Sequence, residues 1–180
     1  LADFFRLNGI SYEALPIETN DEGKENLFAG RCDVYTTDAS GLSSTRAAAS
    51  NPDKWKVLPE IISKEPLGPL VRHGDHQWGD VVRWSLNAMI IAEELGVTSE
   101  NVDAQMSSNV PEVLRLLGVE GNYGEMLELS NDWAYQIIKQ IGNYSESYEA
   151  NVGPDTPLEI ARGLNALWTQ GGILYAPPFR

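Results

Sequence analysis

The stretch Glu65-Pro66-Leu67-Gly68-Pro69-Leu70-Val71-Arg72 divides the sequence into two parts with different patterns. Two prolines and a glycine within four positions rule out a regular helix, because proline lacks the backbone donor and restricts the residue before it. We therefore expect residues 65–72 to form an extended connector between two bodies. The patterns on either side of this connector then indicate the fold class.

Before the connector, residues 1–64 alternate between helical and strand-like patterns. Three helices are predicted, over residues 1–8, up to Gly30, and over residues 40–50. Each is followed by a short β-rich segment, and these segments lie at residues 10–14, 32–37 and 56–62. This alternation is typical of βαβ units around a parallel sheet, so the predicted fold class is α/β.

After the connector, residues 73–180 are predicted to be mainly helical. Asp75 is a suitable N-cap for a long helix that ends at Gly96, and its apolar positions form a broad face. Further helices are expected after Pro111, ending at Gly118, and after Asp132. Thr156-Pro157 is a favourable start for a last helix through Trp168.

The charge of the chain excludes several classes of partner. Its 180 residues carry 13 Lys and Arg against 26 Asp and Glu, a formal net charge of -13. A nucleic-acid-binding protein needs a basic stripe that displaces counterions from phosphates, and the sequence has none. No apolar run approaches the roughly 20 residues of a membrane-spanning helix. We therefore expect neither nucleic acid nor direct membrane insertion.

Asp38 is the first candidate for a binding residue, with Thr37 beside it. Asp38 follows the β-rich segment 32–37 and precedes a helix, and open α/β sheets bind ligands just beyond the carboxyl ends of their strands. A carboxylate there can receive a cationic group through charge-assisted hydrogen bonds. Asp38 can instead cap the following helix, and its position alone favours this capping role over ligand binding.

Motifs for catalysis, cofactors and metals are absent. His73, Asp75, His76 and Asp80 lie close in sequence, but their spacing does not define a metal site. The chain has neither a Gly-x-Ser-x-Gly nucleophile elbow nor a glycine-rich phosphate loop. Cys32 is the only cysteine, so an internal disulfide is impossible. We predict no cofactor, no metal and no catalytic residue.

Several longer motifs resemble one known family. The first two are Ala29-Gly30-Arg31-Cys32-Asp33-Val34-Tyr35-Thr36-Thr37-Asp38 and the segment from Leu58 to Pro69. Four more follow at Asp132-Trp133-Ala134, at Gly142-Asn143-Tyr144, at Arg162 to Trp168, and at Tyr175-Ala176-Pro177-Pro178. The sequence is similar in these motifs to the extracytoplasmic amino-acid-binding proteins of bacterial ABC transporters, and within them to the general L-amino-acid-binding subgroup.

The resemblance implies a two-lobed α/β fold of the periplasmic-binding-protein type II, of which this chain is the C-terminal half. Residues 1–64 would be the second lobe without its first strand, and residues 65–72 would cross back to the first lobe. Residues 73–180 would pack on that absent lobe. Asp38 matches the residue that receives the α-ammonium of the ligand. Cys32 would form a disulfide with a residue outside this chain.

The function implied by the resemblance is the capture of L-amino acids in the periplasm and their delivery to a permease in the inner membrane. The precursor would carry a signal peptide, and the protein would not be an enzyme. A fragment of this kind exposes the face that would otherwise pack on the missing lobe. We therefore expect the fragment to self-associate through this face. Two alternatives remain open, namely a dehydratase-like enzyme on the same fold and an amino-acid sensor domain.

Overall fold

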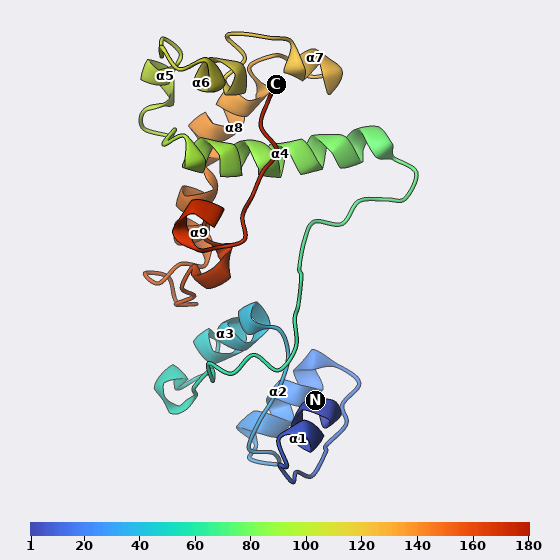
Figure 1. Ribbon diagram of the computed structural model, residues 1–180. Coiled ribbons are helices and arrows are strands. Elements are labelled where there is room, and N and C mark those ends of the chain that lie inside the picture. Colours follow the sequence, from blue (N-terminus) through green and yellow to red (C-terminus); the bar gives the residue numbers. More distant parts are fainter. The chain divides into compact units, whose positions relative to one another are not determined.

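The computed structural model describes all 180 residues and divides them into two compact units. Unit 1 comprises residues 1–67 and unit 2 comprises residues 68–180. Figure 1 shows unit 1 in blue and teal and unit 2 in green to red. The boundary lies inside the proline-containing connector, where a chain that cannot continue a helix separates the two units.

Unit 1 contains three short α-helices and one 3-10 helix. They are α1 (Ala2–Leu7), α2 (Asn20–Phe28), α3 (Ala39–Ala47) and η1 (Pro52–Lys54). Thr19 caps α2 and Asp38 caps α3, each through a side-chain oxygen that accepts a backbone N–H of the first turn. Gly9 and Gly30, just after α1 and α2, have φ values of 65° and 68°, the left-handed conformation that ends helices.

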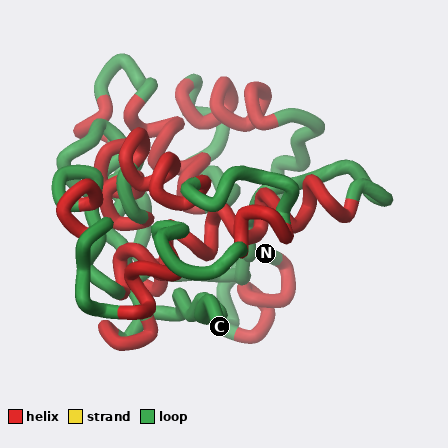
Figure 2. The backbone as a smooth tube through the Cα atoms, turned by 90° about the horizontal axis from the view of Figure 1, so that it is seen from above, coloured by secondary structure: helices red, strands yellow, loops and turns green.

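The α/β lobe predicted for residues 1–64 is not observed, because the structure contains no β-strand. The predicted strands at residues 10–14, 32–37 and 56–62 are loops, and Figure 2 accordingly shows only helices and loops. A β-strand exists only when a neighbouring strand pairs with its N–H and C=O groups. These three segments form no ladder with one another, so their β-rich composition alone does not produce a sheet.

The apolar side chains of unit 1 are incompletely buried. Every buried hydrophobic residue of the chain lies between residues 88 and 179, in unit 2. Within unit 1, Leu7, Val34 and Ile61 are exposed to 81, 61 and 79 %. The strand prediction therefore fails at residues that have neither strand partners nor a core to pack against.

Unit 2 contains six α-helices and two 3-10 helices around one hydrophobic core. They are α4 (His76–Glu94), α5 (Val102–Gln105), α6 (Pro111–Leu116), α7 (Tyr123–Met126), α8 (Trp133–Ile141), α9 (Tyr144–Asn151), η2 (Gly163–Asn165) and η3 (Trp168–Gln170). The nineteen-residue α4 packs against α6, α8 and α9. None of the helices combines the length and apolarity of a bilayer-spanning segment.

The C-terminal segment crosses α4 and completes this core (Figure 1). Phe179 is 8 % exposed and packs against three rings, those of Trp84, Tyr123 and Trp133. Arg115 of α6 donates from Nε to the backbone oxygen of Phe179 over 3.1 Å. The last residues are therefore part of the folded unit.

Three of the four helices predicted in the second half are present, and the prediction of the last helix is wrong. Asp75 accepts the N–H of Trp78 as the cap of α4, and the helices expected after Pro111 and Asp132 are α6 and α8. No helix runs from Thr156 to Trp168. Glu159 has a φ of 52°, which a right-handed helix cannot accommodate. The Thr156 hydroxyl donates to the Gly153 oxygen, which closes a turn instead.

A capping box joins α9 to the loop after α4 in unit 2. The Asn143 side chain accepts the Glu146 N–H, and the Asn143 N–H donates to the Glu146 carboxylate over 2.8 Å. Asn143 Nδ2 donates to the Val97 oxygen over 2.9 Å. The Ser99 hydroxyl donates to Glu146 over 2.6 Å.

We expect Asn143→Ala to destabilise unit 2 by about 1–3 kcal/mol, because it removes a helix cap and leaves the buried Val97 oxygen without its donor. Asn122→Ala is the matched control, because Asn122 precedes α7 without a side-chain cap bond and is exposed. Urea unfolding of both variants measures the difference. Equal midpoints would show that the network around Asn143 contributes nothing to stability.

Candidate functional site

The candidate binding residue Asp38 lies at the first turn of α3, in unit 1. Its backbone is extended, with φ -62° and ψ 155°, and the helix begins at the next residue. Oδ1 of Asp38 accepts the Gly41 N–H over 2.8 Å and the Ser40 hydroxyl over 2.5 Å. The structure therefore shows the capping role that the sequence position favoured.

Hydrogen bonds keep the Asp38 carboxylate ionised. The Ser40 hydroxyl, followed by the Gly41 N–H, lowers the pKa of Asp38 below its ordinary value, because both donors stabilise the charged form. The group therefore carries a full negative charge at neutral pH. Ser40 is a member of this site that the sequence analysis missed, although its place two residues after a capping Asp is a recognisable signal.

Thr37 lies beside Asp38, and the structure brings the two predicted site residues together. The Thr37 hydroxyl donates to Oδ2 of Asp38 over 3.4 Å, a long hydrogen bond. A Cβ at Gly41 would lie 2.9 Å from Oδ2 and 3.2 Å from the Thr37 methyl carbon. Glycine at position 41 therefore lets the carboxylate and Thr37 pack closely over the helix start.

The Asp38 carboxylate can accept a further donor. An ionised carboxylate has about four acceptor positions, and Ser40, Gly41 and Thr37 use three of them. The side chain is partly exposed. This arrangement can bind a positively charged N–H group, with the anion already fixed in position by its cap.

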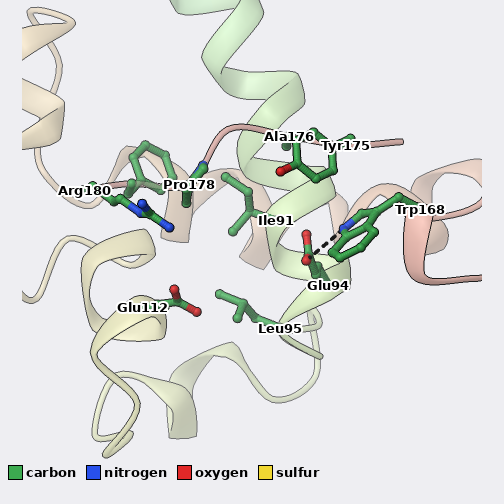
Figure 3. A pocket seen from close by; sticks show the side chains of 10 residues that line it. Ile91, Glu94, Leu95, Glu112, Trp168, Tyr175, Ala176, Pro178 and Arg180 are labelled. Carbon is green, nitrogen blue, oxygen red and sulfur yellow. Dashed lines mark hydrogen bonds between the residues drawn. The ribbon is translucent and has the colours of Figure 1, made fainter. Parts of the chain in front are cut away.

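The other predicted positions are not assembled into a site. Cys32 is free and partly exposed, and it lies in the loop after α2, so the predicted strand around it is absent. His73, Asp75 and His76 border a surface hollow of unit 2, but no group of His, Cys, Asp and Glu in the chain is arranged to hold a metal ion. Neither this hollow nor the one shown in Figure 3 is lined by Asp38 or Thr37.

Comparison with known proteins gives close relatives over the whole chain, although no protein-family model matches it. A glutamate/glutamine/aspartate/asparagine-binding protein of Rhodobacter capsulatus is 54 % identical over 181 residues, which cover 100 % of this chain and 54 % of the relative. A general L-amino acid-binding periplasmic protein of Rhizobium johnstonii is 54 % identical and covers 100 % of this chain and 53 % of its own length. A putative amino-acid ABC transporter-binding protein of Escherichia coli K12 is 52 % identical.

A solved structure supports the same relationship. A periplasmic binding protein of an ABC transporter from Brucella ovis, with glutathione bound, superimposes with a TM-score of 0.92 at 49 % identity. The match covers 99 % of this chain and 56 % of the other. The chain thus has the backbone of the corresponding part of a periplasmic binding protein, and it spans about half the length of the relatives it matches. The resemblance seen in the sequence motifs is confirmed. The whole chain is homologous to amino-acid-binding proteins of bacterial ABC transporters, over about half of the length of those proteins.

Proposed function

We propose that this chain is part of the solute-binding component of an amino-acid ABC transporter. In this role it captures L-amino acids in the periplasm and delivers them to the permease in the inner membrane. The observation that supports this proposal is the sequence identity of 52 to 54 % over the entire chain with proteins that are named for amino-acid binding.

The chain corresponds, in this proposal, to the C-terminal half of the complete binding protein. Residues 1–64 belong to the second lobe, residues 65–72 cross back to the first lobe, and residues 73–180 pack on that lobe. The exposed apolar side chains of unit 1 support this arrangement, because a covering lobe would remove them from water. The segments at 10–14, 32–37 and 56–62 would pair once their partner strands are present.

The proposal has three further parts, which concern self-association, Cys32 and the precursor. Without a covering lobe, the chain associates with itself through its apolar side chains. Cys32 is free here and forms its disulfide with a residue outside this chain, which an oxidising periplasm permits. The precursor carries a signal peptide for export.

Asp38 and Thr37 are the ligand-binding residues of this chain in the proposal, with Asp38 receiving the α-ammonium group. Asp38 is anionic, fixed by its cap and able to accept another donor. The glutathione in the Brucella ovis protein supports this assignment by its chemistry. Its γ-glutamyl residue carries a free α-ammonium and α-carboxylate, the same head group that every free amino acid presents.

An enzymatic role has no support in the relatives, which are named as binding proteins. We propose that the protein does not catalyse a reaction. A dehydratase-like enzyme would consume a bound ligand, so an assay for turnover separates that alternative from binding. A sensor domain would bind the same ligands without stimulating transport.

The proposal is tested with a chimera in which the Rhizobium relative supplies the residues that this chain does not cover. Calorimetry should show binding of L-glutamate, L-glutamine and L-leucine, and of glutathione. Glutarate is the matched control, because it is glutamate without the α-ammonium group and should bind at least tenfold more weakly. Equal binding of glutarate, or no binding of any amino acid by a folded chimera, would contradict the proposal.

A further inference from the structure

A second candidate binding site lies wholly within unit 2, in a surface hollow of about 210 Å³. Figure 3 shows it between the C-terminal half of α4, the start of α6 and the C-terminal segment. Ile91 and Leu95 of α4 form an apolar floor, and Pro178 contributes to one wall. A hollow with an apolar floor favours a ligand with an aliphatic part.

Two exposed aromatic rings form one side of this hollow. The rings of Trp168 and Tyr175 meet edge to face with their centroids 5.5 Å apart, and the side chains are exposed to 49 and 72 %. The backbone holds them together, because the Trp168 N–H donates to the Leu174 oxygen over 3.0 Å. Large aromatic rings kept in solvent at a fixed position are typical of binding surfaces.

Two carboxylates stand on opposite sides of the same hollow. Glu94 is next to Trp168, whose indole Nε1 donates to Oε1 of Glu94 over 3.1 Å, and Glu112 lies across the floor from it (Figure 3). The second oxygen of Glu94 can accept another donor. Arg180 is the only cation among the lining residues, so the hollow has an excess of negative charge within a chain of net charge -13.

We propose that this hollow binds an arginine side chain presented by a polypeptide partner. The aliphatic stem lies on Ile91 and Leu95, as the stems of long cationic side chains do on apolar surfaces. The guanidinium stacks on the Trp168 ring, with the nearly perpendicular Tyr175 ring beside it, and donates to Glu94 and Glu112. Arginine fits better than lysine because its flat head group stacks and donates at the same time.

The test uses the intact 180-residue chain and N-acetyl-L-arginine amide as the probe. This probe has neither the free α-ammonium nor the α-carboxylate of an amino acid, and the variant Asp38→Asn tests whether its guanidinium binds at Asp38 instead. N-acetyl-L-citrulline amide is the matched neutral probe of nearly the same shape. In NMR titrations up to the solubility limit, the arginine probe should bind at least tenfold more tightly than the citrulline probe. Its affinity should fall as salt is raised.

Variants separate this hollow from the rest of the surface. Glu112→Gln and Trp168→Phe should each weaken binding of the arginine probe at least threefold. Glu120→Gln is the control, because Glu120 is exposed after α6 and does not line the hollow, and it should leave the affinity unchanged. Glu112 is also exposed, so its variant should fold normally.

The outcomes distinguish this proposal from the proposed function. Equal binding of the two probes, absence of binding, or an unchanged affinity in Glu112→Gln would overturn the arginine site. Loss of probe binding in Asp38→Asn would overturn it as well, because the probe would then occupy the other unit. None of these results bears on amino-acid capture, which the chimera tests with free amino acids.

Discussion

Glu93→Ala is expected to destabilise unit 2 by about 3 kcal/mol, since it removes one partner of a largely buried ion pair. The Arg162 guanidinium donates through Nη2 to both carboxylate oxygens of Glu93, at 3.0 and 3.1 Å. The two side chains are only 16 and 9 % exposed. The cation would remain in place with no anion beside it.

The surroundings of Arg162 make relocation of its charge costly. The guanidinium lies over the rings of Tyr144 and Tyr148, each with a centroid 5.3 Å away, and it also donates to the Asn165 oxygen. It thereby joins α4, α9 and η2. Burial raises the pKa of both tyrosines, which therefore remain neutral rings at physiological pH.

Asp80→Ala on the same helix is the matched control. Asp80 pairs with Arg83 over 3.2 Å, but the side chains of this pair are 48 and 69 % exposed, and exposed pairs contribute at most about 1 kcal/mol. Urea unfolding followed by tryptophan fluorescence reports mainly on unit 2, which holds four of the five tryptophans. If both variants unfolded at the same urea concentration, the Glu93–Arg162 pair would not be a stabilising feature.

Asp38→Asn is expected to weaken binding of every amino acid at least tenfold in the chimera, by a similar factor whatever the ligand side chain. A tenfold loss corresponds to about 1.4 kcal/mol. Asparagine is as good an N-cap as aspartate and can still accept the Gly41 N–H. The substitution therefore removes the charge that we propose receives the ligand ammonium, and it keeps the helix start.

Two measurements separate the binding role of Asp38 from its cap. Calorimetry with several amino acids gives the affinity, and thermal unfolding without ligand gives the stability, which should change little. Asp38→Ala is the comparison, because it loses the cap and should destabilise the helix start by about 1 kcal/mol. If Asp38→Asn bound amino acids as tightly as the unchanged protein, Asp38 would be only a cap.

The sequence predicted helix ends better than it predicted strands. Gly30, Gly96 and Gly118 were expected to end helices, and all three have positive φ in the structure. At Gly118 a Cβ would also lie within 2 Å of the Asn131 oxygen. These signals are local, because a glycine determines its own backbone conformation. Strands need partners, and the composition of residues 32–37 cannot supply one.

The errors in unit 2 have an equally physical origin. Thr156-Pro157 has the chemistry of a helix start, but the positive φ of Glu159 does not allow a right-handed helix to continue there. The start of α9 was missed although Asn143 and Glu146 have the spacing of a capping box. For the site, the sequence predicts Asp38 and Thr37 as ligand-binding residues, and this stays a prediction. The hollow at Trp168 combines residues of α4, α6, η3 and the C-terminal segment, which no local pattern reveals.

The capping box of α9 has a consequence for how the protein can be produced. Asn143-Tyr144-Ser145 is an acceptor sequence for N-linked sugars, which are attached to the asparagine side-chain nitrogen. That nitrogen is the one that donates to the Val97 oxygen, in a residue that is 5 % exposed. A glycan added before folding, as in a eukaryotic secretory pathway, cannot be accommodated at the start of α9. Bacterial hosts without this modification, or a Ser145→Ala variant, keep Asn143 available for its fold.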